Sequence, residues 1–94
     1  MKKEFYNIAN LVTKNAKILD VGCGNGELMK YITENISKDI RGIELSKSNV
    51  QECVEKGLTV IEGDAEKDLK QFPDNSFDFV ILSQTLQAFL DPEN

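Results

Sequence analysis

Three glycines at every second position constrain this chain more than any other feature, in the run Ile18-Leu-Asp-Val-Gly-Cys-Gly-Asn-Gly-Glu-Leu28. An apolar run that ends in an acid precedes the glycines, and a segment with helical periodicity follows them. This order predicts a strand, a tight loop and a helix. Glycine at Gly22, Gly24 and Gly26 permits positive φ angles and leaves no side chain between the backbone and a ligand. The run therefore predicts a loop whose main chain contacts a small molecule, with a simple strand-to-helix turn as the alternative.

The spacing of the glycines bears on which small molecule the loop binds. The dinucleotide fingerprint G-x-G-x-x-G places its third glycine inside the helix, whose N-terminus faces a pyrophosphate. Here the third glycine comes one residue early, and Glu27 stands where the fingerprint requires glycine. A carboxylate at that point would repel a pyrophosphate and compete with it for the positive end of the helix dipole. The spacing therefore disfavours the interpretation that this chain is half of an NAD-dependent dehydrogenase.

The run from Asp20 to Gly26 resembles motif I of the class I S-adenosylmethionine-dependent methyltransferases, whose D-x-G-x-G-x-G loop approaches the methionine half of the cofactor. Two acids downstream extend the pattern. Glu44 trails the glycines by close to the roughly 20 residues at which an acid in nucleotide-binding βαβ units accepts the ribose hydroxyls. In the methyltransferase pattern an acid after the third strand receives the adenine amino group, and the next backbone N–H reaches the ring. Asp64 and Ala65 occupy those positions.

Strand and helix patterns alternate along the chain and predict a Rossmann-like α/β fold with helices on both faces of the sheet. We expect strands at residues 17–21, 39–45, 58–62 and 77–83, and the start of a helix at 85–90. Since strands joined through helices are connected by right-handed crossovers, the sheet should be parallel with strand order 3-2-1-4. Ligands of such sheets bind at the C-terminal ends of the strands.

Three helices are predicted before the last strand. Residues 4–13 form an amphipathic pattern that should pack under the sheet, with a lid over the ligand as the alternative. Residues 27–35 follow the glycine loop. Ser48 is expected to cap the next helix, which Gly57 ends, with Val50, Cys53 and Val54 on its inner face.

Composition limits the remaining classes of function. At 94 residues, 40% hydrophobic and 29% charged, the chain is expected to form one globular domain over residues 1–94. No apolar stretch approaches the ~20 residues of a membrane span, and the N-terminus lacks a signal-peptide pattern, so we expect a cytoplasmic protein. A formal net charge of −5 without a Lys/Arg cluster argues against nucleic acid as a partner. Without histidine or a C-x-x-C pair, no zinc site is expected.

The predicted fourth strand narrows the resemblance to one family. Together with Arg41-Gly-Ile-Glu44 and Val60-Ile-Glu-Gly-Asp64, the run Phe72-Pro-Asp-Asn-Ser-Phe-Asp-Phe-Val-Ile-Leu-Ser-Gln-Thr-Leu-Gln87 resembles the MetW family of methionine-biosynthesis proteins. These are small methyltransferase-like proteins found beside homoserine O-acetyltransferase. Members of that family continue past this length with further strands. The resemblance therefore implies a truncated class I methyltransferase fold that carries the cofactor-binding half of the domain.

The resemblance also implies a function. We expect the chain to bind S-adenosylmethionine, to transfer its methyl group to an unknown small-molecule acceptor and to release S-adenosylhomocysteine. The implied cofactor-binding residues are Asp20, Gly22, Cys23, Gly24, Gly26, Glu44, Leu45, Asp64, Ala65 and Ser83. No catalytic residue is assigned, since transfer from a sulfonium needs mainly proximity and alignment. The alternative function is a non-catalytic regulatory partner of a homoserine O-acyltransferase.

The predicted strand at 77–83 also bears on association between copies. An apolar strand at the edge of a sheet leaves its backbone N–H and C=O groups unpaired and is a template for another chain. We therefore expect this edge, or the segment 85–90, to contact a second copy in a homo-oligomer. The alternative is that the last segment folds back over the edge, for which Leu86, Phe89 and Leu90 have enough apolar area.

Overall fold

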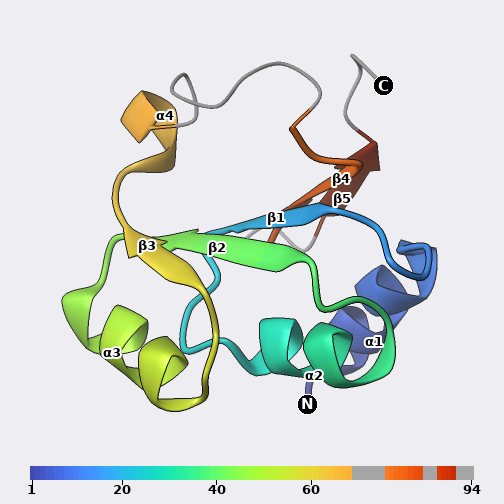
Figure 1. Ribbon diagram of the computed structural model, residues 1–94, viewed down its shortest axis with the longest axis horizontal. Coiled ribbons are helices and arrows are strands. Elements are labelled where there is room, and N and C mark those ends of the chain that lie inside the picture. Colours follow the sequence, from blue (N-terminus) through green and yellow to red (C-terminus); the bar gives the residue numbers. More distant parts are fainter. Residues whose placement is uncertain (69–75, 84–86, 91–94) are drawn as a thin grey trace.

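A computed structural model of the chain describes residues 1–68, 76–83 and 87–90 and contains a sheet of five strands in the order β3-β2-β1-β4-β5 (Figure 1). The strands are β1 (Ile18–Val21), β2 (Ile40–Glu44), β3 (Val60–Glu62), β4 (Phe79–Leu82) and β5 (Gln87–Leu90). β1 pairs in parallel with both β2 and β4, β2 pairs in parallel with β3, and β5 is antiparallel to β4. The predicted parallel order 3-2-1-4 and the Rossmann-like α/β class are confirmed.

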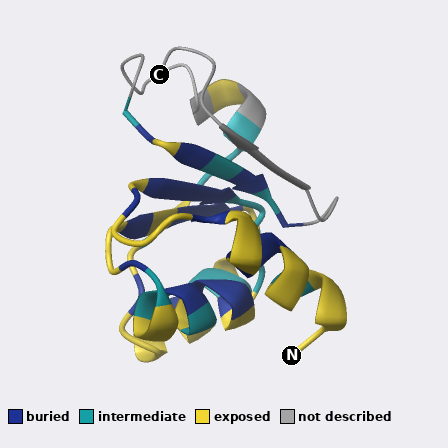
Figure 2. Cartoon of the chain, turned by 90° about the vertical axis from the view of Figure 1, so that its right-hand side faces the viewer, coloured by how far each residue is buried: buried dark blue, intermediate teal, exposed yellow. Residues whose placement is uncertain are grey.

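The helices are α1 (Lys3–Leu11), α2 (Glu27–Asn35), α3 (Lys47–Glu55) and the short α4 (Ala65–Asp68). In Figure 1, α1, α2 and α3 lie on one face of the sheet, and α4 lies on the other side. The main core forms under the sheet, where Met29 and Ile32 of α2 meet Ile18 of β1 and Ile81 of β4 (Figure 2). All four side chains are fully buried. Each such side chain contributes about 1.5–3 kcal/mol by burial, so this core fixes α2 against β1.

A second, smaller cluster forms on the opposite face of the sheet. Leu19, Ile43 and Phe77 are buried there, and Val21 packs against them. Successive side chains of a strand point to opposite faces, so Ile18 and Leu19 serve different clusters. Strands that are buried on both faces require nearly continuous apolar sequence, which explains the composition of β1 and β4.

The start of α3 differs from the prediction. The cap is Ser46 rather than Ser48, because the Ser46 hydroxyl accepts the Asn49 N–H at 3.3 Å and the helix already begins at Lys47. Gly57 ends the helix as predicted, with a φ of 79°. Cys53 lies on the inner face, but Val54 is 59% exposed, so its assignment to that face was wrong.

The last described element corrects one prediction and agrees with the alternative offered for another. Residues 87–90 form the strand β5 instead of part of a helix, while the predicted positions 85 and 86 lie outside the described residues. β5 pairs along β4, from Phe79 opposite Leu90 to Leu82 opposite Gln87. The unpaired backbone groups of β4 are satisfied by this pairing, which outweighs the helical preference of a short segment. The edge on which a homo-oligomer was expected is therefore covered within the chain.

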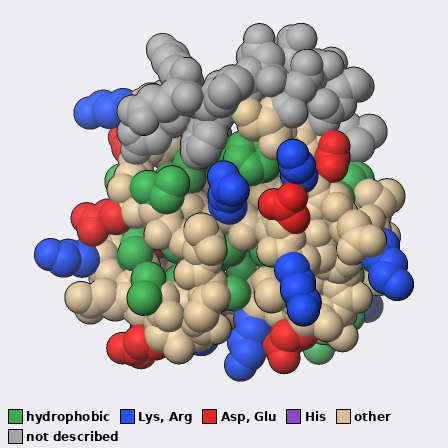
Figure 3. Space-filling view, in the orientation of Figure 1, with side chains coloured by type: hydrophobic (Ala, Val, Ile, Leu, Met, Phe, Trp, Pro, Cys, Tyr) green, Lys and Arg blue, Asp and Glu red, His purple; other side chains and the backbone are tan. Residues whose placement is uncertain are grey.

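Within the described ranges, none of the helices combines the length and the apolar character needed to cross a membrane. On the face shown in Figure 3, basic and acidic side chains are interspersed over the elements in view. Ligands of parallel α/β sheets bind at the C-terminal ends of the strands, and the candidate site lies there.

Candidate functional site

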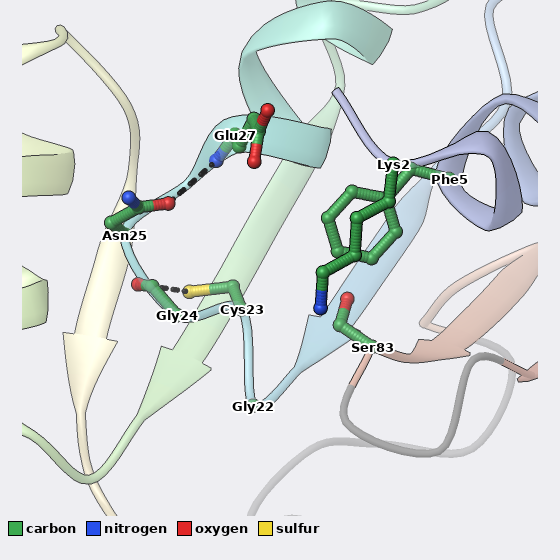
Figure 4. Close-up of a pocket in the computed structure, with 8 residues that line it drawn as sticks. All are labelled: Lys2, Phe5, Gly22, Cys23, Gly24, Asn25, Glu27 and Ser83. Carbon is green, nitrogen blue, oxygen red and sulfur yellow. Dashed lines mark hydrogen bonds between the residues drawn. The ribbon is translucent and has the colours of Figure 1, made fainter.

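The C-terminal ends of the parallel strands bring the glycine loop and the downstream polar residues together. Glu44 ends β2, Asp64 follows β3, Ser83 follows β4, and the loop that begins at Gly22 follows β1. Two cavities open here. One of about 280 Å³ is lined by Lys2, Phe5, Gly22, Cys23, Gly24, Asn25, Glu27 and Ser83 (Figure 4). The other, of about 300 Å³, is lined by Val21, Gly22, Ile43, Glu44, Leu45, Gly63, Asp64 and Ala65. We call them the loop cavity and the strand-end cavity.

The two cavities share Gly22, so they lie on either side of the first residue of the loop. Most of the predicted cofactor-binding residues line one cavity or the other. Asp20 and Gly26 line neither of them and are both buried. Gly26 therefore contributes to the packing of the site and Asp20 to its electrostatics.

Gly24 shows why the loop requires glycine. Its φ is 60°, in the left-handed region, where a side chain costs about 1–2 kcal/mol. A Cβ atom added to Gly24 would meet no other atom within 4 Å. The residue thus combines a backbone conformation that favours glycine with open space beside the main chain, which is the arrangement expected where a ligand approaches the backbone.

Gly26 has a different function, because it makes room for packing beneath the loop. It also has a positive φ, of 87°, but its Cβ would lie 2.5 Å from Leu58 Cδ1 and 2.9 Å from Cys53 Sγ. Both neighbours are buried. The third glycine of the motif is therefore needed so that the loop can lie against the end of α3 and the segment before β3.

We expect Gly26→Ala to lower the free energy of unfolding by about 2 kcal/mol more than Gly57→Ala, measured by urea denaturation. Gly57 is the matched control, since its φ is 79° and its Cβ would meet nothing within 4 Å. Both variants carry the backbone strain of a left-handed residue, so the difference isolates the steric conflict. Equal losses in the two variants would show that the loop moves away from Cys53 without cost.

Both cysteines support the loop as hydrogen-bond donors. The Cys53 thiol donates to the Gly24 carbonyl at 3.3 Å, and the Cys23 thiol donates to the same carbonyl at 3.8 Å. Burial raises the pKa of both thiols, and the nearby charge of Asp20 raises the pKa of Cys23 further. They therefore remain protonated and able to donate. Gly42 of β2 makes room for Cys23, since a Cβ there would lie 2.8 Å from the Cys23 sulfur.

Glu44 ties the loop to the end of β2. Its Oε1 accepts the Gly24 N–H at 2.9 Å, and its Oε2 accepts the Ser46 N–H at 3.0 Å and the Asn49 side-chain amide at 3.4 Å. Only 5% of the residue is exposed, although it lines the strand-end cavity. A carboxylate has about four lone-pair sites, so three donors leave capacity for one more. The predicted contact to two ribose hydroxyls would therefore compete with the long bond from Asn49.

Asp20 is the most deeply buried acid of the site. The Ser83 hydroxyl donates a hydrogen bond to Asp20 Oδ1, and Oδ2 has no partner among the described residues. Burial raises the pKa of Asp20 from its ordinary value of 3.8 to about 7, the Ser83 hydrogen bond opposes this shift, and the charge of Glu44 adds to it. The carboxyl group lies behind Ser83, which itself lines the loop cavity. Asp20 can thus act on a ligand through Ser83.

The strand-end cavity combines an apolar wall with polar groups. Leu45 is 69% exposed and lines this cavity beside Glu44. Asp64 and Ala65 line it as well, at the start of α4. The Gly63 N–H donates to the Glu44 carbonyl at 3.0 Å, which fixes this turn against β2. An exposed leucine beside two carboxylates suits a flat, partly apolar ring that carries hydroxyl and amino groups.

The N-terminal segment contributes to the loop cavity, for which sequence reasoning had offered only the alternative of a lid over the ligand. Lys2 and Phe5 line that cavity, and Phe5 also packs against the main core. The amphipathic pattern of residues 4–13 was expected to pack under the sheet, and no pattern marked Lys2. Asn25 lines the cavity too, and its Oδ1 accepts the Glu27 N–H at 3.3 Å (Figure 4). Lys2 and Phe5 belong to the site because α1 packs beside α2, whereas Asn25 belongs to the glycine loop itself.

The sequence is similar to that of known methionine-biosynthesis proteins and methyltransferases. The family described as "Methionine biosynthesis protein MetW" matches residues 2–94. The bifunctional methionine biosynthesis protein MetXA/MetW of Rhodopirellula baltica is 32% identical over 90 residues, which is 87% of this chain and 14% of that protein. Phosphoethanolamine N-methyltransferase 3 of Arabidopsis thaliana is 34% identical over 93 residues, which is 95% of this chain and 19% of that protein. The chain thus spans less than a fifth of either relative.

A solved structure shares the fold. The S-adenosylmethionine-dependent methyltransferase from Thiobacillus denitrificans, in complex with S-adenosylhomocysteine, superposes with a TM-score of 0.59 at 21% sequence identity. The match covers 69% of this chain and 30% of that one. The sheet order showed a Rossmann-like fold, and this superposition shows that it is the fold of class I methyltransferases.

Proposed function

The chain belongs to the MetW family of methionine biosynthesis proteins, and on that premise we propose that it binds S-adenosylmethionine and takes part in methyl transfer to a small-molecule acceptor. One observation carries the proposal. Two cavities meet at Gly22, and the acids that follow two successive parallel strands line one of them. A ligand with an adenosine end and an amino-acid end fits this pair of cavities, because each end finds groups of the required chemistry.

The adenosine end is assigned to the strand-end cavity. The free lone-pair site of Glu44 would accept a ribose hydroxyl, Leu45 would lie against the adenine ring, and Asp64 would accept its amino group. The N–H of Ala65 would reach a ring nitrogen. Open space beside Gly24 and the shared wall at Gly22 supply the path between the cavities. The Thiobacillus denitrificans enzyme of related fold was solved in complex with S-adenosylhomocysteine, which supports an adenosyl ligand for this fold.

The loop cavity would then hold the methionine end of the cofactor. S-adenosylmethionine supplies an activated methyl group on a sulfonium, and its transfer is an in-line displacement. The residues of this chain contribute alignment, which is worth about 7–11 kcal/mol in well-oriented reactions. The Ser83 hydroxyl donates a hydrogen bond to Asp20, so its oxygen lone pairs can still accept from a cationic group of the ligand. None of the described residues is assigned as a general base, so an acceptor that loses a proton on methylation would release it to solvent.

Isothermal titration calorimetry with S-adenosylmethionine, S-adenosylhomocysteine and NAD tests the proposed ligand. We expect the two adenosyl ligands to bind one molecule per chain, and NAD to bind at least about tenfold more weakly, the change produced by about 1.4 kcal/mol. Glu27 is the physical reason, since its carboxylate lies at the N-terminus of α2, where a pyrophosphate would sit. Binding of NAD alone would contradict the assignment.

A second candidate function follows from one comparison. The Rhodopirellula baltica relative is a bifunctional MetXA/MetW protein. The union of the two parts in one protein supports association, and the second candidate is therefore a non-catalytic function in which this chain binds a homoserine O-acyltransferase and regulates it. Co-purification with the acyltransferase of the same organism, and its rate with and without the chain, test this candidate. Neither complex formation nor a change in rate would count against it, and calorimetry decides the cofactor question separately.

A further inference from the structure

The N-terminal segment places a cation at the loop cavity. Lys2 precedes α1 and lines the cavity with Phe5, while Ile8 and Ala9 of the same helix are buried in the main core. In Figure 4 the Lys2 side chain extends toward the hydroxyl of Ser83, beside the Phe5 ring. Because the core fixes α1, the position of Lys2 at the cavity follows from the packing of the helix rather than from the loop.

The charge of Lys2 is available to a ligand. Within residues 1–68, 76–83 and 87–90 the structure gives its ammonium no ion pair, and it lies 5.7 Å from the centroid of the Phe5 ring. The acid that lines the same cavity, Glu27, instead has its Oε1 3.5 Å from the α-amino group of Met1. In a chain with a formal net charge of −5, the cavity thus holds a cation without an acidic partner in the described part.

We propose that Lys2 binds the terminal carboxylate of an adenosyl amino-acid ligand and thereby selects ligands that carry an amino-acid tail. This inference rests on the proposed function, since it assigns one end of the same ligand. Ser83 supplies the complementary half. Its hydroxyl donates a hydrogen bond to Asp20, so its oxygen can accept a hydrogen bond from the α-ammonium of the tail. The Lys2 ammonium would bind the carboxylate of the amino-acid tail, and the Ser83 oxygen would accept a hydrogen bond from its α-ammonium.

Two probes isolate the tail. S-Adenosylhomocysteine and 5′-methylthioadenosine share the adenosine and the sulfur, and only the first carries a carboxylate and an ammonium. We expect Lys2→Gln to weaken S-adenosylhomocysteine binding about fivefold, the range for a partly exposed ion pair, and to leave 5′-methylthioadenosine binding unchanged. The fivefold change should shrink as the ionic strength rises, because salt screens exposed charges.

Lys3→Gln is the matched control. It removes the same charge one residue away, from an exposed position that lines neither cavity. We expect it to change the affinity for neither probe. Thermal unfolding of both variants, at the same midpoint as the parent, shows that α1 is intact.

The outcomes separate the two proposals. If the parent binds both probes and Lys2→Gln weakens neither, or weakens both equally, the assignment of Lys2 is wrong while the cofactor site stands. An effect of Lys3→Gln equal to that of Lys2→Gln would also overturn it, because general electrostatic attraction would then suffice. If the parent binds neither probe, the proposed cofactor site is itself wrong and Lys2 loses its ligand.

Discussion

Replacing Asp20 with Asn is expected to raise the free energy of unfolding much more at about pH 8 than at about pH 4. The gain of Asp20→Asn over the parent should be about 4 kcal/mol larger at the higher pH. Asparagine has nearly the shape of aspartate, and its Oδ1 can still accept the hydrogen bond from Ser83. The variant removes a charge that burial disfavours. The measurement is urea denaturation of both proteins over this pH range.

The sign follows from the raised pKa of Asp20. The unfolded chain releases this proton near pH 3.8, whereas the folded chain retains it until about pH 7. Between these values the folded state binds one proton more, so the stability of the parent falls as pH rises, and above pH 7 the loss is complete. In Asp20→Asn this part of the pH dependence should be absent.

Two further variants test the cause. Ser83→Ala removes the hydrogen bond that opposes the shift, so the pKa of Asp20 should rise and this variant should lose more stability at high pH than the parent does. Asp39→Asn changes an exposed carboxylate before β2 and should leave the pH dependence as it is in the parent. Identical pH profiles for Asp20→Asn and the parent would mean that Asp20 is solvated.

Glu44→Ala is expected to weaken S-adenosylhomocysteine binding about a hundredfold, or about 3 kcal/mol. The variant loses the acceptor for the ribose, and it leaves the N–H groups of Gly24 and Ser46 without their partner. We therefore also expect a lower free energy of unfolding, unlike a carboxylate that touches only the ligand. Calorimetry and urea denaturation measure the two effects.

Two variants separate ligand binding from support of the loop. Glu44→Gln keeps the length of the side chain and one acceptor, so its loss of affinity should lie between that of Glu44→Ala and the parent. Glu62→Gln is the matched control, because Glu62 lies opposite Glu44 in the register of β2 and β3, is exposed and lines neither cavity. Unchanged affinity in Glu44→Ala would show that the ribose lies elsewhere.

The sequence predicted the parts of the site that local patterns determine. Alternating strand and helix patterns fixed the order of four strands, and parallel strands must end at one edge, so Glu44, Asp64 and Ser83 could be placed together. The glycine spacing predicted positive φ angles in the loop, and the structure has them at Gly22, Gly24 and Gly26. Each of these features follows from a local pattern, combined with the rule that parallel strands end at one edge of the sheet.

The features that the sequence missed depend on contacts between distant residues. Gly26 could not be told from Gly24, because the contact with Leu58 and Cys53 forms only when the loop meets α3. The pairing of β5 with β4 satisfies backbone groups that a helical pattern does not reveal. Lys2 reaches the loop cavity only through the docking of α1.

A crystal structure of the chain with S-adenosylhomocysteine tests most directly whether the loop cavity and the strand-end cavity form one binding site. One molecule should span both cavities past Gly22, with its ribose at Glu44, its adenine beside Leu45 and Asp64, and its amino-acid end at Ser83. The opposite orientation, occupancy of a single cavity by the whole ligand, or binding away from the strand ends would contradict the proposed site.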